Sequence, residues 1–267
     1  MTISIDKPVT FSLIGQRVTN QDYVYPVDER SGLFIVCDGI GGWDQGEVAS
    51  RLVAEAVARF MEQHPTDCIE ESYLAEALAS AYRTLLEYLS QNRLLSRLGT
   101  TLALLQLTSR GATVAHVGDS RVYHMRGGVI LHQTLDHKYV QDLVAGGIIT
   151  EEQALNHPRR HTLSRSIGVQ SNESPLRMDK GEIAHIADIQ MGDFFFLCTD
   201  GVLEQVDDQS LRNIFAQYET SQDIADQLLG RCRNLTRDNY SGCLVRIKHV
   251  SREKANLPFG IFGQSQE

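Results

Sequence analysis

The feature of this sequence that most constrains its fold is a run of short strands with very short connections. Between residues 100 and 133, apolar segments are separated only by Ser109-Arg110-Gly111, Gly118-Asp119-Ser120 and Arg126-Gly127-Gly128. Connections of this length cannot contain a crossover helix, so they favour an antiparallel meander. The predicted strands are Thr100–Leu107, Thr113–Val117, Arg121–Met125 and Val129–Gln133.

Helical patterns stand in blocks on either side of this run. Apolar residues at helical spacing predict helices from Glu47 to the His64-Pro65 stop, from about Ser72 to Leu95, and at 140–145, 208–217 and 222–235. Further strands are predicted at 9–15, 33–37, 183–186, 194–198 and 243–250. Blocks rather than strict alternation indicate an α+β fold with antiparallel sheets packed against helices. We expect one domain over residues 1–250 and a flexible tail over 251–267.

Charge and cysteine usage narrow the class of protein. The 267-residue chain has a formal net charge of −9, which argues against nucleic-acid binding. Its five cysteines follow no disulfide or metal-binding pattern and fit a reducing cytoplasm. The first residues do not resemble a signal peptide, and no apolar run approaches the roughly 20 residues of a membrane helix. We therefore expect a soluble cytoplasmic monomer that binds neither nucleic acid nor membrane.

Two distant segments share one construction, an apolar strand that runs directly into Asp-Gly. One ends in Cys37-Asp38-Gly39 and the other in Cys198-Thr199-Asp200-Gly201. A single Asp-Gly pair is most simply a turn. Two such strand ends brought together would present carboxylate and carbonyl oxygens, which Mg²⁺ and Mn²⁺ prefer as ligands. The matched pair therefore predicts a divalent metal site, whereas the nine histidines show no zinc-ligand spacing.

An ordered series of short motifs extends this pattern over most of the chain. The motifs are Arg17-Val18-Thr19-Asn20-Gln21-Asp22, Asp38-Gly39-Ile40-Gly41-Gly42, Gly99-Thr100-Thr101, Val117-Gly118-Asp119-Ser120-Arg121, Leu135-Asp136-His137, Leu163-Ser164-Arg165-Ser166-Ile167-Gly168, Thr199-Asp200-Gly201 and Asp238-Asn239. This series resembles the metal-dependent protein phosphatases of type 2C, the PPM family, and is most similar to their bacterial minimal-domain members. The resemblance spans nearly the whole chain and implies a four-layer sandwich of two antiparallel β-sheets flanked by helices.

The resemblance also implies an activity, that of a protein serine/threonine phosphatase. Such an enzyme hydrolyses phosphoserine and phosphothreonine in phosphorylated protein substrates and counteracts a Ser/Thr protein kinase. Two divalent ions about 3.5–4 Å apart can activate the attacking water and neutralise the phosphoryl oxygens. Mn²⁺ and Mg²⁺ accept the same oxygen ligands, so the choice between them stays open.

The resemblance assigns metal ligands to particular residues of this sequence. Asp38 would bridge the two ions, and the Gly39 carbonyl would bind one of them. Asp200 and Asp238 would complete the shell of the other ion. Asp119 would join Asp200 at a third, weaker metal site, and the alternative is that Asp119 is a hairpin residue.

Other residues would act on water and substrate. By the same resemblance, Asp22 would orient metal-bound water, and Arg17 would hold the substrate phosphate through parallel hydrogen bonds. Asp22 could instead cap a turn, and Arg17 could be a surface charge. The segment 138–161 resembles the flap of the bacterial members, and its Arg159 and Arg160 would contact a phosphoprotein or merely solvate a loop.

The sequence departs from the family pattern in three places, one of them a pair of residues. Ile40 stands where many eukaryotic members have a histidine proposed as general acid, and Gln21 replaces a glutamate. Tyr240-Ser241 replaces an apolar-Thr pair, a change we expect to be structural.

Two competing interpretations of the sequence are a catalytically silent phosphoprotein-binding relative and a haloacid-type phosphatase. The full set of aspartates opposes the first, and the absence of an Asp-x-Asp motif after Val36 opposes the second.

Overall fold

The computed structural model describes residues 1–27, 32–171 and 178–251. Eleven of its strands form two antiparallel sheets, and β5 and β10 make a separate two-stranded pair. Of the tail predicted over residues 251–267, only Ser251 is described, and it ends a strand rather than belonging to a tail. The sequence also predicts a turn-rich connection from Asp28 to Gly32, of which residues 28–31 lie outside the described residues. No helix in the described ranges is long and apolar enough to cross a membrane.

The larger sheet has six strands in the order β1-β13-β12-β8-β9, with β2 also paired to β13. Every pairing in it is antiparallel. Its last strand is the longest element of the sheet, because it pairs with three different strands. The bounds are β1 (Thr2–Ile5), β2 (Val9–Leu13), β8 (Arg121–Arg126), β9 (Val129–Gln133), β12 (Phe194–Cys198) and β13 (Tyr240–Ser251).

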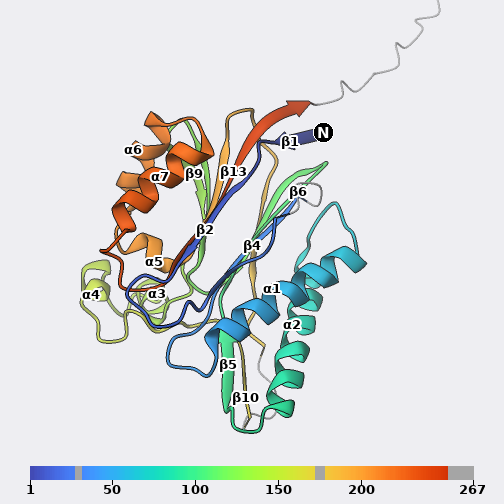
Figure 1. Ribbon diagram of the computed structural model, residues 1–267, viewed down its shortest axis with the longest axis vertical. Helices are drawn as coiled ribbons and strands as arrows, with labels where there is room; N and C mark the ends of the chain where they lie inside the picture. Colours follow the sequence, from blue (N-terminus) through green and yellow to red (C-terminus); the bar gives the residue numbers. More distant parts are fainter. Residues whose placement is uncertain (28–31, 172–177, 252–267) are drawn as a thin grey trace, which may run out of the picture.

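The second sheet has five strands in the order β11-β7-β6-β4-β3, and it is also antiparallel. The two-stranded pair extends beyond it at one end (Figure 1). The bounds are β3 (Asp22–Val24), β4 (Leu33–Asp38), β6 (Leu102–Thr108), β7 (Gly111–Val117) and β11 (Glu182–Ile186), with β5 (Arg97–Thr100) and β10 (Ile167–Gln170) in the pair.

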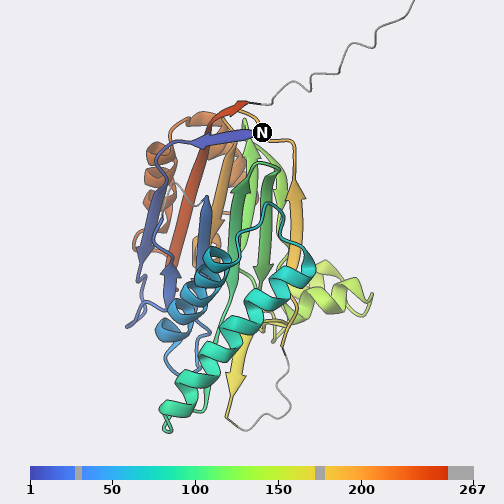
Figure 2. The ribbon, with the colours of Figure 1, turned by 90° about the vertical axis from the view of Figure 1, so that its right-hand side faces the viewer.

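Helices cover the outer face of each sheet. Figure 1 shows α1 and α2 on one side of the molecule and α6 and α7 on the other. The short helices α3 and α4 lie apart from these layers, and α4 projects from the body of the molecule (Figure 2). The bounds are α1 (Gly46–Gln63), α2 (Glu71–Gln91), α3 (Tyr139–Ala145), α4 (Glu151–Leu155), α5 (Asp200–Leu203), α6 (Asp208–Gln217) and α7 (Ser221–Cys232).

Alternation along β4 shows why the structure has layers. Ile35 and Cys37 pack into the core formed with α1 and α2, whereas Phe34 and Val36 pack into the core between the two sheets. Successive side chains of a strand point to opposite faces, so a strand buried on both faces is apolar throughout. The same alternation along Phe194–Cys198 divides β12 between the inter-sheet core and the core under α6 and α7. Three cores separate four layers, which confirms the predicted four-layer α+β sandwich.

The predicted meander over residues 100–133 was wrong in two respects. The strand expected at Thr100–Leu107 is divided, because β5 pairs with β10 while β6 joins the five-stranded sheet. The turn Gly118-Asp119-Ser120 is not a hairpin, because β7 and β8 belong to different sheets. Gly118 has φ +99°, a conformation that glycine adopts readily, and the chain crosses there from one sheet to the other. Asp119 therefore stands between the two sheets rather than at a hairpin tip.

Candidate active site

A cavity of about 870 Å³ opens where ends of the two sheets meet. Its lining includes the carboxylates of Asp38, Asp119, Asp200 and Asp238 together with Arg17. Asp38 is the last residue of β4, and Asp200 is the first residue of α5 directly after β12. The two Asp-Gly strand ends therefore come from different sheets and reach the same cavity.

Asp22 lies behind Asp38 in the same sheet. The two residues face each other in the register of β3 and β4, and Asp22 is buried. Thr199 donates a hydrogen bond from Oγ1 to Asp22 Oδ2 at 2.9 Å. Asp22 Oδ1 is buried without a hydrogen-bond partner among the described residues. A buried carboxylate oxygen without a partner is costly, so this atom is suited to bind a cation or an ordered water.

Burial and neighbouring carboxylates raise the pKa of three aspartates at this site. Burial, followed by the charges of Asp22 and Asp200, raises the pKa of Asp38 well above its ordinary value. Burial and the charge of Asp119 raise the pKa of Asp200 to about 8. Burial also raises the pKa of Asp22 to about 7, although hydrogen bonds from Ser241 and Thr199 oppose the shift. Ionised carboxylates this close repel one another, and bound divalent cations would relieve that repulsion. The donor set, made of carboxylate oxygens, therefore fits hard divalent cations.

Threonines of the Gly99-Thr100-Thr101 motif hold the end of β4 in place. The Asp38 amide donates to Thr101 Oγ1 at 2.9 Å, and Thr100 Oγ1 donates to the Asp38 carbonyl at 2.7 Å. Gly39 follows at a close approach of two backbones, because a Cβ at this position would lie 2.3 Å from the Gly46 carbonyl oxygen. A side chain at Gly39 would therefore push the start of α1 away from the cavity.

Asn239 links the Arg17 loop to the start of β13. Its amide nitrogen donates to the carbonyls of Ile14 and Thr19 at 2.8 and 3.0 Å, and its Oδ1 accepts from the Gln21 amide at 2.8 Å. The loop that carries Arg17 is thus tied at both ends. Asn239 thus holds Asp238 next to the Arg17–Asp22 motif, although the two are far apart in sequence.

Arg17 and Asp238 are paired with each other. Arg17 donates from Nε to Asp238 Oδ1 at 2.9 Å and from Nη2 to Oδ2 at 2.6 Å. The guanidinium is half-exposed, and its Nη1 makes neither of these two bonds. Arg17 is therefore anchored at the mouth of the cavity by the same carboxylate that sequence analysis assigns to a metal ion.

The flap contributes a further wall of the cavity. Arg160 and His161, which follow α4 after a short polar stretch, line it. Arg159 is placed differently, with its guanidinium over the Tyr139 ring at 3.8 Å from the ring centroid. Of the two arginines predicted to contact substrate, only Arg160 faces the cavity.

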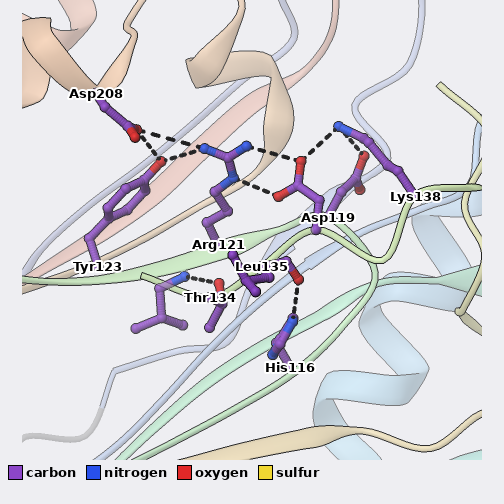
Figure 3. Close-up of polar contacts among 10 residues, drawn as sticks. His116, Asp119, Arg121, Tyr123, Thr134, Leu135, Lys138 and Asp208 are labelled. Atoms are coloured by element: carbon purple, nitrogen blue, oxygen red, sulfur yellow. Dashed lines mark hydrogen bonds and ion pairs between the residues drawn. The ribbon is translucent and has the colours of Figure 1, made fainter. Parts of the chain in front are cut away.

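Sequence reasoning assigned no role to Lys138 or Thr199. Lys138 Nζ lies 3.0 Å from Asp119 Oδ2, beside the carboxylates of the cavity (Figure 3). The signal for Thr199 was present, since a threonine immediately precedes Asp200 at the end of β12. The signal for Lys138 was a cation directly after Asp136-His137 in a polar motif, but nothing in the sequence shows which carboxylate it meets.

Histidines that are distant in sequence do come together outside the cavity. His116, His137 and Glu182 offer ligand atoms within 4.8 Å of one another. A cation already stands there, because Arg165 Nη1 donates to Glu182 Oε1 at 2.8 Å and lies 3.3 Å from His137 Nε2. His116 Nε2 is engaged with the Leu135 carbonyl at 2.7 Å. Protein groups therefore already engage each member of this cluster.

Comparison with known proteins agrees with this site. A model of the family described as Protein phosphatase 2C matches residues 12–229. The chain therefore belongs to the protein phosphatase 2C family of metal-dependent serine/threonine phosphatases and is of the bacterial catalytic-domain type.

Individual relatives are similar to this chain over most of its length. A Streptococcus pyogenes protein named as a protein phosphatase of type 2C is 32% identical over 84% of this chain and 92% of its own length. The serine/threonine phosphatase stp of Listeria innocua is 29% identical over 83% of this chain and 87% of its own. The solved catalytic domain of the phosphatase PstP, in complex with two manganese ions, is similar with a TM-score of 0.74 at 26% identity. That match covers 93% of this chain and 100% of the other.

Proposed function

We propose that this chain hydrolyses phosphoserine and phosphothreonine in protein substrates, with two divalent cations held by Asp38, the Gly39 carbonyl, Asp200 and Asp238. The observation that carries the proposal is the convergence of carboxylates from both sheets on one cavity, where burial and the neighbouring charges raise the pKa of Asp38 and Asp200. Such a cluster is unfavourable without cations and suited to a binuclear site.

The chain's own residues divide the remaining work. When bound, the cations supply positive charge to the phosphoryl oxygens and lower the pKa of a coordinated water. Asp22 orients water from behind Asp38, where its Oδ1 has no other described partner. Arg17, anchored by Asp238, holds the phosphate with its remaining guanidinium hydrogens. Ile40 lines the cavity and offers no proton, so it leaves the alcohol without a side-chain acid at that position.

The biological setting follows from the reaction class. A phosphoprotein phosphatase removes the phosphoryl group that a Ser/Thr protein kinase has added. We therefore propose that such a kinase acts on the same protein substrates and opposes this enzyme. All five cysteines are free thiols in the structure, which supports a reducing cytoplasm. Mn²⁺ and Mg²⁺ both suit the oxygen ligands of the cavity.

Hydrolysis of p-nitrophenyl phosphate and of a phosphothreonine peptide tests the proposal. Activity should require added Mn²⁺ or Mg²⁺, disappear with excess EDTA, and fall by several orders of magnitude in Asp38→Ala. A silent phosphoprotein-binding relative would bind the peptide without turning it over. Full activity in excess EDTA would contradict the proposed mechanism.

A further inference from the structure

Lys138 places a fixed positive charge beside the proposed metal ligands. Its Nζ lies 3.0 Å from Asp119 Oδ2 and 3.1 Å from Asp136 Oδ2, and its side chain is only 17% exposed (Figure 3). The ammonium thus occupies a fork between two carboxylates. One of them, Asp119, lines the cavity together with Asp200.

We propose that the ammonium group of Lys138 takes the place of a third divalent cation at Asp119. The inference rests on the proposed two-cation function. It implies that this chain holds two divalent cations at the site rather than three. Sequence analysis expected Asp119 and Asp200 to share a third, weaker ion, and the residues present do not fit that ion. The Lys138–Asp119 pair is buried, with side chains 17% and 8% exposed, so the ammonium charge is little screened and opposes a second cation at Asp119. The Arg17–Asp238 pair is more exposed, at 52% and 32%, and opposes a cation at Asp238 less.

A chain of contacts behind Lys138 fixes the ammonium in this position. Arg121 donates to both oxygens of Asp136, from Nε at 2.6 Å and from Nη2 at 3.0 Å. Arg121 Nη1 also donates to the Tyr123 hydroxyl at 2.8 Å, and that hydroxyl donates to Asp208 Oδ1 at 3.2 Å. Asp136 is therefore already neutralised by Arg121, and Asp119 is the carboxylate whose charge Lys138 balances.

The backbone of Lys138 restrains it as well. Lys138 precedes α3, and its carbonyl accepts hydrogen bonds from the amides of Gln141 and Asp142 at 2.9 and 3.2 Å. It also forms a β-bridge with Leu163, which lines the cavity. The lysine therefore could leave Asp119 only by moving its side chain away from both carboxylates or by moving the root of the flap.

The electrostatic setting keeps Lys138 charged. Burial alone would lower its pKa, but the charges of Asp119, Asp136 and Asp200 raise the pKa above the ordinary value of a lysine. A divalent ion on Asp119 would lie within a few ångströms of this ammonium and would be repelled by it.

The number of Mn²⁺ ions bound per chain tests the proposal. It can be measured by equilibrium dialysis with metal analysis and by titration calorimetry, and neither depends on activity. Lys138→Ser should bind one more Mn²⁺ than the wild type. The affinity for Mn²⁺ at Asp119 should be at least about tenfold higher in this variant than in the wild type. Lys138→Arg keeps the cation and should bind the same number as the wild type. Lys248→Ser, which removes an exposed lysine on β13, is the matched control.

Asp119→Asn provides a second test that does not disturb Lys138's contact with Asp136. The Mn²⁺ count of the wild-type chain should be unchanged by it, whereas the extra ion of Lys138→Ser should be lost in the double variant. Equal counts in Lys138→Ser and the wild type would overturn the proposal, as would the loss of one ion in Asp119→Asn alone.

Failure of the proposed function would look different. It would appear as EDTA-insensitive hydrolysis by the wild type, whereas the present inference depends on the difference in Mn²⁺ count between variants of Lys138.

Discussion

At the scale of single residues, the aspartates of the cavity oppose folding while they prepare a metal site. The pKa of Asp200 is raised to about 8 by burial and by Asp119, so its ionised form is disfavoured in the folded chain. An unfolded Asp ionises near pH 3.9. Between about pH 4 and 8 the folded chain binds the proton that the unfolded chain has released, and stability without metal therefore falls as pH rises.

Asp200→Asn should separate stability from function. In EDTA, the variant should melt at a higher temperature than the wild type, with the gap growing from pH 5 to pH 8. Its turnover with Mn²⁺ should fall by several orders of magnitude, because a ligand is lost. Differential scanning calorimetry at several pH values checks the first result, with the exposed Asp67→Asn as control. A lower melting temperature in EDTA across this range would contradict the interpretation.

At the scale of elements, the flap places its two arginines in different environments. Arg160 lines the cavity, whereas Arg159 packs on the ring of Tyr139. Sequence analysis could not separate them, because adjacent residues in a polar loop carry no signal of direction. A substrate that extends beyond the phosphate would therefore meet Arg160 first.

Arg160→Ala should lower kcat/KM for a phosphothreonine peptide more than Arg159→Ala, and more strongly at low salt, where exposed charges are less screened. Hydrolysis of p-nitrophenyl phosphate should change much less in both variants. Steady-state kinetics at two salt concentrations measure the effect. Equal losses on the peptide and the small substrate would indicate damage to the flap rather than lost recognition.

A second element-scale feature joins β8 to the turn before β12. Buried Asp193 accepts from His124 Nε2 at 2.8 Å and from Arg126 Nε at 2.6 Å. Burial alone would raise the pKa of Asp193, but hydrogen bonds from Arg126 and His124 lower it to about 2. Because the folded pKa is depressed, this stabilisation is present above the unfolded value and is lost as pH falls toward 2.

Asp193→Asn should therefore lower the free energy of unfolding at pH 7 by about 1–3 kcal/mol. The difference from the wild type should narrow as pH falls from 5 toward 2, where the wild-type carboxylate becomes protonated. Urea unfolding at a series of pH values measures it, and a constant difference over this range would show that the charge of Asp193 contributes nothing. Asp226→Asn on the exposed side of α7 serves as a matched substitution.

At the scale of the whole molecule, the proposed ligands connect the two halves of the sandwich. Asp38 ends a strand of the five-stranded sheet, whereas Asp200 and Asp238 flank strands of the six-stranded sheet. Cations bound by both sets would oppose separation of the sheets. Ligand that binds only the folded state at about 100 times its Kd adds roughly 2.7 kcal/mol of stability.

Saturating Mn²⁺ should accordingly raise the melting temperature of the EDTA-treated protein by roughly 5–11 °C, since 1 kcal/mol corresponds to about 2–4 °C in a chain of this size. The shift should disappear in Asp38→Asn. Differential scanning fluorimetry measures both, and an equal shift in that variant would place the stabilising ions elsewhere.

The sequence alone determined the α+β class, most element types and the aspartates that could form a metal site. Those inferences rest on local signals: period-two and helical spacing, short connections, and Asp-Gly at strand ends. Local signals did not predict every element or every connection correctly. They missed β1, β3, β10, α4 and α5 and all but the last residue of β5. They also placed the end of α2 near Leu95 instead of Gln91, and took the Gly118-Asp119-Ser120 crossing for a hairpin.

Only the tertiary structure decided how the charges pair. Arg17 meets Asp238, Lys138 meets Asp119, and Thr199 meets Asp22, although the first and last of these pairs are separated by more than 170 residues. Such contacts depend on which sheet each strand joins and on the register of its pairing. The local sequence around a residue carries no information on which distant residue will be its partner. The metal site could be foreseen from its residue types, but the lysine beside it could be placed only when the two sheets were brought together.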